Sequence, residues 1–166
     1  MARPTGPRGG RTTVSPPAAT GTGEVAAQLR ELFRTQGLAV LSTQGGGQPY
    51  SSLVAFAATP DLRELLFATT RATRKFHNLA AEPRVSLLVD NRSNREADFQ
   101  EAMAATAVGR AREVDDSDLV ALRDLHLAKH PSLGAFLAAP DCALIRVQVE
   151  AYYLVQRFQD VQILHP

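Results

Sequence analysis

The stretch FATTRATRKFHNLAAEPRVSLLV, residues 67–89, joins two apolar runs through a short polar segment of helical character. It places Arg71, Arg74 and Lys75 within five residues at the start of the predicted helix. Thr73 is the expected N-cap of that helix. Cations are unfavourable there, because a helix start carries unsatisfied N–H groups and the positive pole of the helix dipole. A bound anion would make these cations favourable, because it attracts both the cations and the N–H groups, so the stretch predicts a phosphate-binding helix start. A solvated cluster of surface cations is the alternative.

The patterning on both sides of this stretch predicts a mainly β (α+β) fold. Six strands are expected, over 38–43, 49–58, 64–69, 84–91, 102–114 and 142–158. Helices are expected from Glu24, over 73–81, and from Asp115 or Asp116 to Pro131. Few helical crossovers separate the strands, which favours an antiparallel barrel with peripheral helices over a parallel doubly wound sheet.

Three glycine positions refine these elements. Gly37 stands where a left-handed cap would end the first helix. The run Gly45-Gly46-Gly47 predicts the turn of a hairpin between the first two strands, and it lacks the Lys and Ser or Thr of a phosphate loop. Gly109 predicts a bulge or bend in the fifth strand.

Composition indicates one domain. The chain has 166 residues with 45% hydrophobic content, enough for one core, which we place at 24–166. Residues 1–23 are rich in Pro, Gly, Ser, Thr and Ala and are predicted to be a disordered basic tail, with binding of an anionic partner as the alternative. The remainder is mildly acidic, so no nucleic-acid partner is expected. The lone Cys142 and the absence of a long apolar run predict a cytoplasmic protein without a membrane span.

Together with Pro49, Tyr50 and Ser51 on the preceding strand, residues 67–89 resemble the flavin site of the pyridoxamine 5'-phosphate oxidase-like FMN-binding split β-barrels. The resemblance covers about Leu38 to Gly109. It implies a six-stranded antiparallel split β-barrel. It also implies FMN contacts from Ser51, Ser52, Leu53, Ala68, Thr69, Thr73, Arg74 and Lys75, with the last three at the phosphate.

The resemblance further implies a homodimer with the cofactor site at the subunit interface. Tyr152, Arg157 or Phe158 of the last strand would then approach the flavin of the second subunit, although plain core or interface packing is the alternative for this aromatic strand. With FMN bound, the ring would carry electrons or hydride and the protein would orient it.

Several positions depart from the authentic oxidase. The family has an Arg and a Lys where this chain has Ser52 and Ala57, and a Gln where it has Ala104. The C-terminal substrate motif with Trp and Arg is also absent. Oxidation of pyridoxamine phosphate is therefore not expected. The resemblance implies an FMN-dependent oxidoreductase for an unknown small-molecule substrate. The alternatives are a non-catalytic binding module for a deazaflavin, haem or other anionic ligand, and a barrel with a vestigial site.

Three histidines are candidate functional residues. His126 and His130 are four residues apart on a predicted helix, a spacing that can bind a metal, but no third ligand is indicated. Solvated or capping side chains are expected instead. His77 lies inside the predicted phosphate segment and is expected on a helix surface. No metal site is predicted.

Overall fold

The computed structural model describes residues 22–157 and 160–166. Nearly all of the predicted tail over 1–23 therefore lies outside the described residues. The helices are α1 (Thr22–Thr35), α2 (Arg74–Ala81), α3 (Asp98–Glu101), α4 (Asp116–Lys129) and α5 (Gly134–Leu137), with a 3-10 turn, η1, at Pro131–Leu133. The strands are β1 (Leu38–Gly45), β2 (Gln48–Ala58), β3 (Glu64–Thr70), β4 (Arg84–Asp90), β5 (Met103–Glu113), β6 (Cys142–Gln156) and β7 (Asp160–Leu164).

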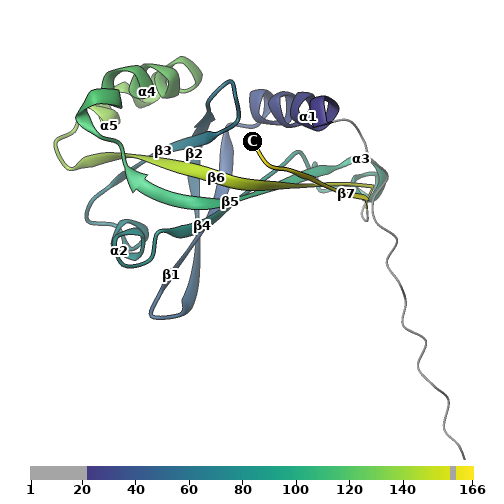
Figure 1. Cartoon of the computed structure of the whole chain (residues 1–166), viewed down its shortest axis with the longest axis horizontal. Helices are drawn as coiled ribbons and strands as arrows, with labels where there is room; N and C mark the ends of the chain where they lie inside the picture. Colours follow the sequence, from purple (N-terminus) through teal and green to yellow (C-terminus); the bar gives the residue numbers. More distant parts are fainter. Residues whose placement is uncertain (1–21, 158–159) are drawn as a thin grey trace, which may run out of the picture.

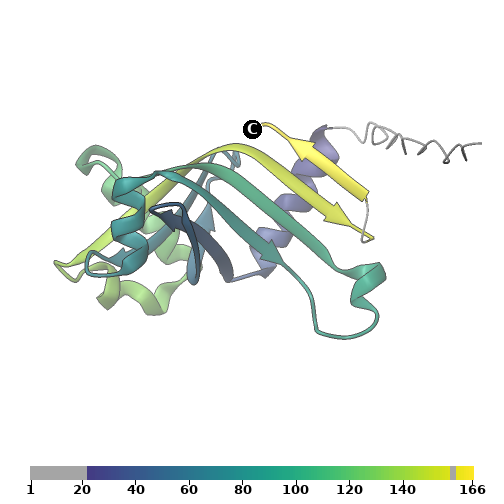
Figure 2. The ribbon, with the colours of Figure 1, turned by 90° about the horizontal axis from the view of Figure 1, so that it is seen from below.

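Six of the strands close into an antiparallel barrel, which confirms the predicted fold class. The strand order is β3-β2-β1-β4-β5-β6-β7, and β3 also pairs with β6, so that β7 is left outside the closed ring. Helices α1 and α4 lie on one side of the barrel, whereas α2 and α3 lie toward opposite ends (Figure 1). Figure 2 shows β5 and β6 running along the molecule from the end that carries α2 to the end that carries α3.

The barrel interior is filled by the alternate residues of each strand. Phe56, Phe67 and Tyr152 are fully buried there, and the ring of Phe33 from α1 meets Phe56 edge-on at 5.4 Å between centroids. Burial of each such side chain contributes roughly 1.5–3 kcal/mol. The Tyr152 hydroxyl donates a hydrogen bond to the Leu62 carbonyl at 2.7 Å, and burial raises its pKa. This tyrosine therefore serves the core.

Helix α4 is attached to the outside of β2 by two histidines whose side chains were expected to be solvated or capping; His130 is indeed the C-cap residue. His126 is fully buried, and its Nε2 lies 3.2 Å from the Ala55 carbonyl. His130 Nε2 lies 2.8 Å from the Phe56 carbonyl. A carbonyl only accepts, so Nε2 carries the proton in both rings. The prediction of solvated side chains is wrong for His126, because the helix face that carries it packs on the sheet.

The burial of His126 predicts a loss of stability at acidic pH. Burial lowers its pKa below the ordinary 6.5, so the unfolded chain binds a proton more readily than the folded one. The stability contributed by neutral His126 is fully present above pH 6.5 and is lost as the pH falls toward the folded-state pKa. We expect His126→Gln to flatten the fall in unfolding free energy between about pH 7.5 and 5.5. Urea unfolding at several pH values in this range measures the unfolding free energy, with His165→Gln as the control. If the unfolding free energy of His126→Gln falls with pH as steeply as that of the wild type, the prediction is contradicted.

The glycine predictions have mixed outcomes. Gly46 and Gly47 have φ of 58° and 82°, which confirms the predicted hairpin turn. The β5–β6 register shifts between Val108 and Gly109, which confirms an irregularity at Gly109, but the extra residue is Glu150, so the bulged strand is β6 and not β5. Gly37 is not among the described residues with positive φ, so the left-handed cap is wrong. Its carbonyl instead accepts a hydrogen bond from the Phe56 N–H at 3.4 Å, because the chain runs directly into the sheet.

The last predicted strand is in fact two strands. β6 ends at Gln156, the chain reverses at Arg157 with φ of 46°, and β7 returns alongside β6 with Tyr153 opposite Ile163. Phe158 lies outside the described residues. A short helix, α3, also lies between β4 and β5, where the sequence predicts no helix or strand. None of the described helices has the length and hydrophobicity needed to cross a membrane.

Candidate functional site

A pocket of about 340 Å³ lies where β2 and β3 meet the start of α2. Its walls include five of the eight residues for which a cofactor contact is predicted, namely Leu53, Ala68, Thr69, Thr73 and Lys75. Two strands and a helix separated in sequence thus meet at one place. The pocket combines apolar walls with hydroxyls and one cation, which is the usual character of a site for a small molecule.

The polar end of the pocket is the start of α2. Thr73 is the N-cap, with φ −80° and ψ 150°, and its Oγ1 accepts a hydrogen bond from the Phe76 N–H at 3.4 Å. The hydroxyls of Thr69 and Thr73 lie 2.9 Å apart. The N–H groups of Arg74 and Lys75 are in the first turn, where no intrahelical carbonyl can accept from them. These donors suit the oxygens of an anion.

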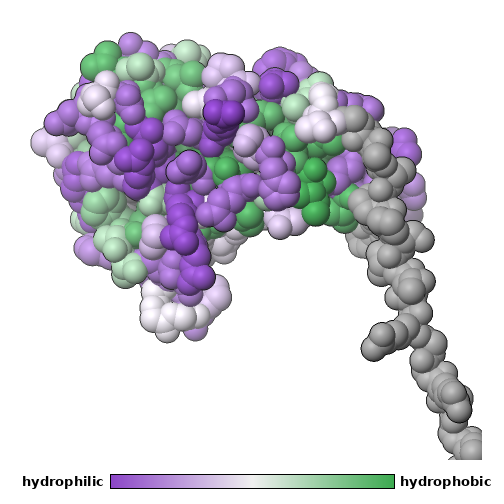
Figure 3. Space-filling model, in the orientation of Figure 1, coloured by the Kyte–Doolittle hydropathy of each residue, from purple (hydrophilic) through white to green (hydrophobic). Residues whose placement is uncertain are grey.

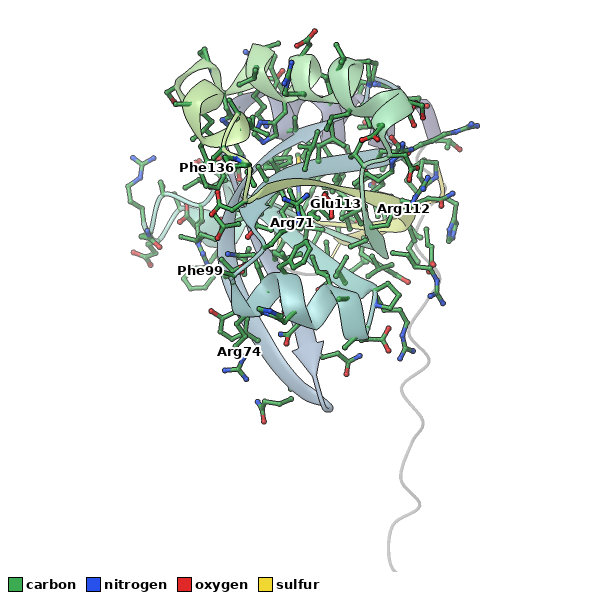
Figure 4. The ribbon with its side chains drawn as sticks, turned by 90° about the vertical axis from the view of Figure 1, so that its left-hand side faces the viewer. Arg71, Arg74, Phe99, Arg112, Glu113 and Phe136 are labelled. Atoms are coloured by element: carbon green, nitrogen blue, oxygen red, sulfur yellow. The ribbon has the colours of Figure 1, made fainter. Side chains whose placement is uncertain are left out.

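The three cations near this helix start have different environments. Lys75 lines the pocket. The Arg74 guanidinium lies 4.8 Å from the centroid of the Tyr50 ring, and in Figure 4 it points away from the barrel. Arg71 instead pairs with Glu113 and donates to the Pro140 and Cys142 carbonyls at 3.2 and 2.9 Å. Arg71 therefore ties the end of β3 to the start of β6, and Lys75 is the one cation of the three that lines the pocket.

A buried hydrogen bond that the sequence did not reveal holds α2 against β1. Asn78 Nδ2 donates to Thr43 Oγ1 at 3.0 Å, and both residues are buried. A Cβ at Gly45 would lie 2.5 Å from Asn78 Oδ1, so only glycine leaves room for this amide. These three residues fix the position of the helix whose start lines the pocket.

The apolar end of the pocket comes from residues that sequence reasoning missed. Leu133 of η1 and Phe136 of α5 line it together with Leu53, and Phe136 remains 37% exposed. Figure 4 shows Phe136 above Arg74 on the same side of the molecule. The polar signals in residues 67–89 pointed to the phosphate end alone, and no local pattern connects Phe136 with a segment that ends 47 residues earlier.

The side chains of Ser51 and Ser52 are not among those that line the pocket. Ser51 is exposed, and its hydroxyl lies 3.3 Å from that of Ser42 on β1. Ser52 alternates with Val54 and Phe56, whose side chains face the core, and its Oγ is buried without a partner among the described residues. Their cofactor contacts remain predictions.

Ser52→Ala tests the role of that hydroxyl. A buried polar group without a partner costs about 1–3 kcal/mol, so its removal is expected to raise the unfolding free energy by about 1 kcal/mol. FMN affinity should change less than about twofold, because the hydroxyl is directed into the barrel. Chemical denaturation and FMN titration of the same preparation measure both effects. A large loss of FMN affinity would instead assign Ser52 to the site.

A larger cavity, of about 770 Å³, lies beside α3 and shares no lining residue with the pocket. Its walls include Phe99, Met103 and Ala104, the last being the position where the family carries Gln. Four of its five charged residues are bonded locally, Arg92 to Asp90 and both Arg95 and Asp98 to Ser93. We therefore place the anion site at α2. Within residues 22–157 and 160–166, no group of three or more His, Cys, Asp and Glu side chains has the arrangement of a metal site.

Similar solved structures support the fold. A haem binding protein from Mycobacterium smegmatis has TM-score 0.75 and 19% identity over 92% of this chain and 60% of its own. General stress protein 26 from Bacillus anthracis has TM-score 0.66 and 22% identity over 86% of this chain and 99% of its own. A FAD-binding protein from Mesorhizobium loti has TM-score 0.62 and 18% identity over 78% and 90%. At these identities the likeness shows the fold alone.

The sequence comparisons identify the family of the chain. No curated protein matches the chain. The family model described as Pyridoxamine 5'-phosphate oxidase matches residues 25–156, a range that contains the barrel, α2 and the pocket. That match covers most of the chain, and the closed six-stranded barrel agrees with it. The chain therefore belongs to the pyridoxamine 5'-phosphate oxidase family.

Proposed function

We propose that this protein binds FMN in the pocket at the start of α2 and acts as a flavin-dependent oxidoreductase on a small molecule. The observation that carries the proposal is the combination of free helix-start N–H groups, two Thr hydroxyls and Lys75 at one end of an apolar pocket. Membership of a family that commonly binds flavins supports it. A phosphate fits the polar end, and an aromatic ring system fits the apolar one.

The residues present fit FMN by the chemistry of their donors. Thr73 and Lys75 would hold the phosphate, with Arg74 beside them once its guanidinium leaves the Tyr50 ring. Leu53, Ala68 and Phe136 would lie along the ring and exclude water from it. When bound, FMN supplies the electron-carrying chemistry, and these side chains position and shield it.

A comparison of FMN with riboflavin tests the proposal. The purified protein is expected to be yellow, or to become yellow when FMN is added. Riboflavin has the same ring without the phosphate, so its affinity should be lower by at least about tenfold if the helix start binds the phosphate. A protein that takes up neither compound would contradict the proposal. Equal affinity for both would contradict the phosphate site.

We also propose that two copies associate through the outer face of the barrel. One cross-strand row of outward residues on this face is largely apolar and contains Leu53, Val40, Leu88, Thr106, Tyr153 and Ile163, paired in that order. Leu53, Tyr153 and Ile163 are exposed by 66%, 38% and 52%. Figure 3 shows hydrophobic surface over the region of β6 and β7. Such a face is typical of an interface.

The row includes Leu53 of the pocket, so a second copy on this face would adjoin the cofactor. Tyr152 is buried and cannot take part, whereas its neighbour Tyr153 faces outward. Light scattering is expected to give the mass of a dimer. Leu88→Lys, at the centre of the row, should give a monomer and weaken FMN binding. A wild-type monomer at micromolar concentration would contradict this proposal.

The second candidate is a binding module without redox turnover, for a deazaflavin, haem or another anionic ligand. One similar structure is a haem binding protein, and this likeness keeps haem among the candidate ligands. His126 and His130 are engaged with carbonyls of β2, so neither is ready to hold haem iron. Titration with haem, and reduction of bound flavin by a nicotinamide donor followed by reoxidation, separate the two functions. A vestigial site would bind neither ligand.

A further inference from the structure

A separate cavity of about 360 Å³ lies between α1, the β2–β3 turn and α4. In Figure 1 the β2–β3 hairpin rises between these two helices. None of the residues lining this cavity lines the flavin pocket. Phe33, Leu62 and Leu125 give it apolar walls. Its volume is at the lower end of the roughly 300–1,000 Å³ typical of small-molecule sites.

All charged residues that line this cavity are cations. They are Arg30 and Arg34 on α1 and Lys129 on α4. Arg34 is engaged with Glu31, at 2.7 and 2.9 Å, on the exposed side of α1. Arg30 donates its Nε to the Pro60 carbonyl at 3.0 Å, which holds the arginine against the cavity and leaves its terminal nitrogens without a recorded partner among the described residues.

The Lys129 ammonium, like the Arg30 guanidinium, has no carboxylate partner among the described residues. Its Nζ donates to the Phe33 carbonyl at 2.7 Å and lies 3.7 Å from the centroid of the Phe56 ring. An ammonium has three donors, so two are left after the bond to Phe33. Burial lowers the pKa of Lys129 to about 8. A carboxylate in the cavity would compensate this charge.

We propose that the cavity binds a small amphipathic monoanion of the medium-chain carboxylate class. The carboxylate would accept hydrogen bonds from Lys129 and Arg30, and the alkyl chain would pack on Phe33, Leu62 and Leu125. This ligand fits because cationic donors and apolar walls occur together, while no carboxylate lines the cavity to repel it. The proposal is independent of the bound flavin.

The lysine content of the chain allows a direct test. Lys75 and Lys129 are its only lysines, one at each site, so protein labelled with ¹³C at lysine Cε gives two assignable NMR signals. Octanoate is expected to shift the Lys129 signal and leave the Lys75 signal in place, whereas FMN should shift Lys75. If octanoate shifts only Lys75, or neither signal, the proposal is overturned.

Variants and a neutral analogue test the role of charge. Octanoate should bind wild-type protein at least about tenfold more tightly than octanol, and Lys129→Met should remove most of that preference. Arg30→Met should weaken octanoate binding severalfold. This second variant keeps the test valid if Lys129→Met does not fold. Arg63→Met serves as control, because this exposed arginine lies outside the cavity. Equal affinity for octanoate and octanol in wild-type protein would mean that Lys129 only donates to the Phe33 carbonyl at the end of α1, and it would overturn the proposal.

Discussion

Replacing Arg74 and Lys75 together with alanine is expected to weaken FMN binding by about 100-fold or more. A hydrogen bond to a charged group contributes roughly 1.5–3 kcal/mol, and about 1.4 kcal/mol corresponds to a tenfold change in affinity. Two such bonds to one phosphate therefore account for at least two orders of magnitude. Fluorescence titration of the apoprotein with FMN measures the change. Stability should stay the same or rise, because the unfavourable cations at the helix start are removed.

The single variants separate the two cations. Lys75→Ala is expected to have the larger effect, because Lys75 lines the pocket while Arg74 must first leave the Tyr50 ring. Arg63→Ala is the matched control, since it removes an exposed cation elsewhere. Riboflavin affinity should be nearly the same in the double variant and the wild type, as riboflavin has no phosphate. If the double variant binds FMN as the wild type does, the phosphate is not at this helix start.

Arg71 provides a second contrast within the same five residues. Its guanidinium pairs with Glu113 and caps two carbonyls near the start of β6, so it serves the structure. From the sequence the three cations looked alike, because spacing alone cannot show which strand each side chain meets. The environment of a long side chain is set by residues far along the chain, here about seventy positions later.

The parts of the site that are predictable from sequence are those with a local cause. The N-cap at Thr73 follows from a hydroxyl directly before a helical pattern, and the structure has Thr73 in that position. The hairpin turn follows from consecutive glycines, and the irregular β5–β6 pairing at Gly109 from a lone glycine in a strand. Each of these depends on the backbone preferences of a few neighbouring residues.

The parts that were missed depend on contacts between distant segments. Asn78 and Thr43 are 35 residues apart and meet only because β1 closes beside α2. Phe136 reaches the pocket from a short helix that follows α4. His126 showed a helical spacing with His130, but nothing local indicated that this face of α4 packs on β2. Burial at such positions is decided by the closed barrel.

Gly109→Ala is expected to destabilise the protein strongly. A Cβ at this position would lie 2.1 Å from the Gln148 carbonyl oxygen and 3.1 Å from the Val149 Cα. Both atoms are backbone, so relief requires the β5–β6 ladder itself to separate at the bulge. Overpacking typically costs about 1–3 kcal/mol, and more where the surroundings cannot move. We therefore expect a loss of at least about 3 kcal/mol.

Thermal unfolding measures this loss, which corresponds to a decrease in Tm of roughly 6–12 °C for a chain of this size. Gly134→Ala is the matched control, because no atom lies within 4 Å of its added Cβ and its φ and ψ of −55° and −48° are helical. That variant should keep or slightly raise the Tm, since alanine favours a helix. Gly109 itself has no positive φ, so strain does not enter and only the close approach to β6 opposes a side chain. A Gly109→Ala variant as stable as Gly134→Ala would mean that the bulge relaxes freely and that the two strands are not held in register there.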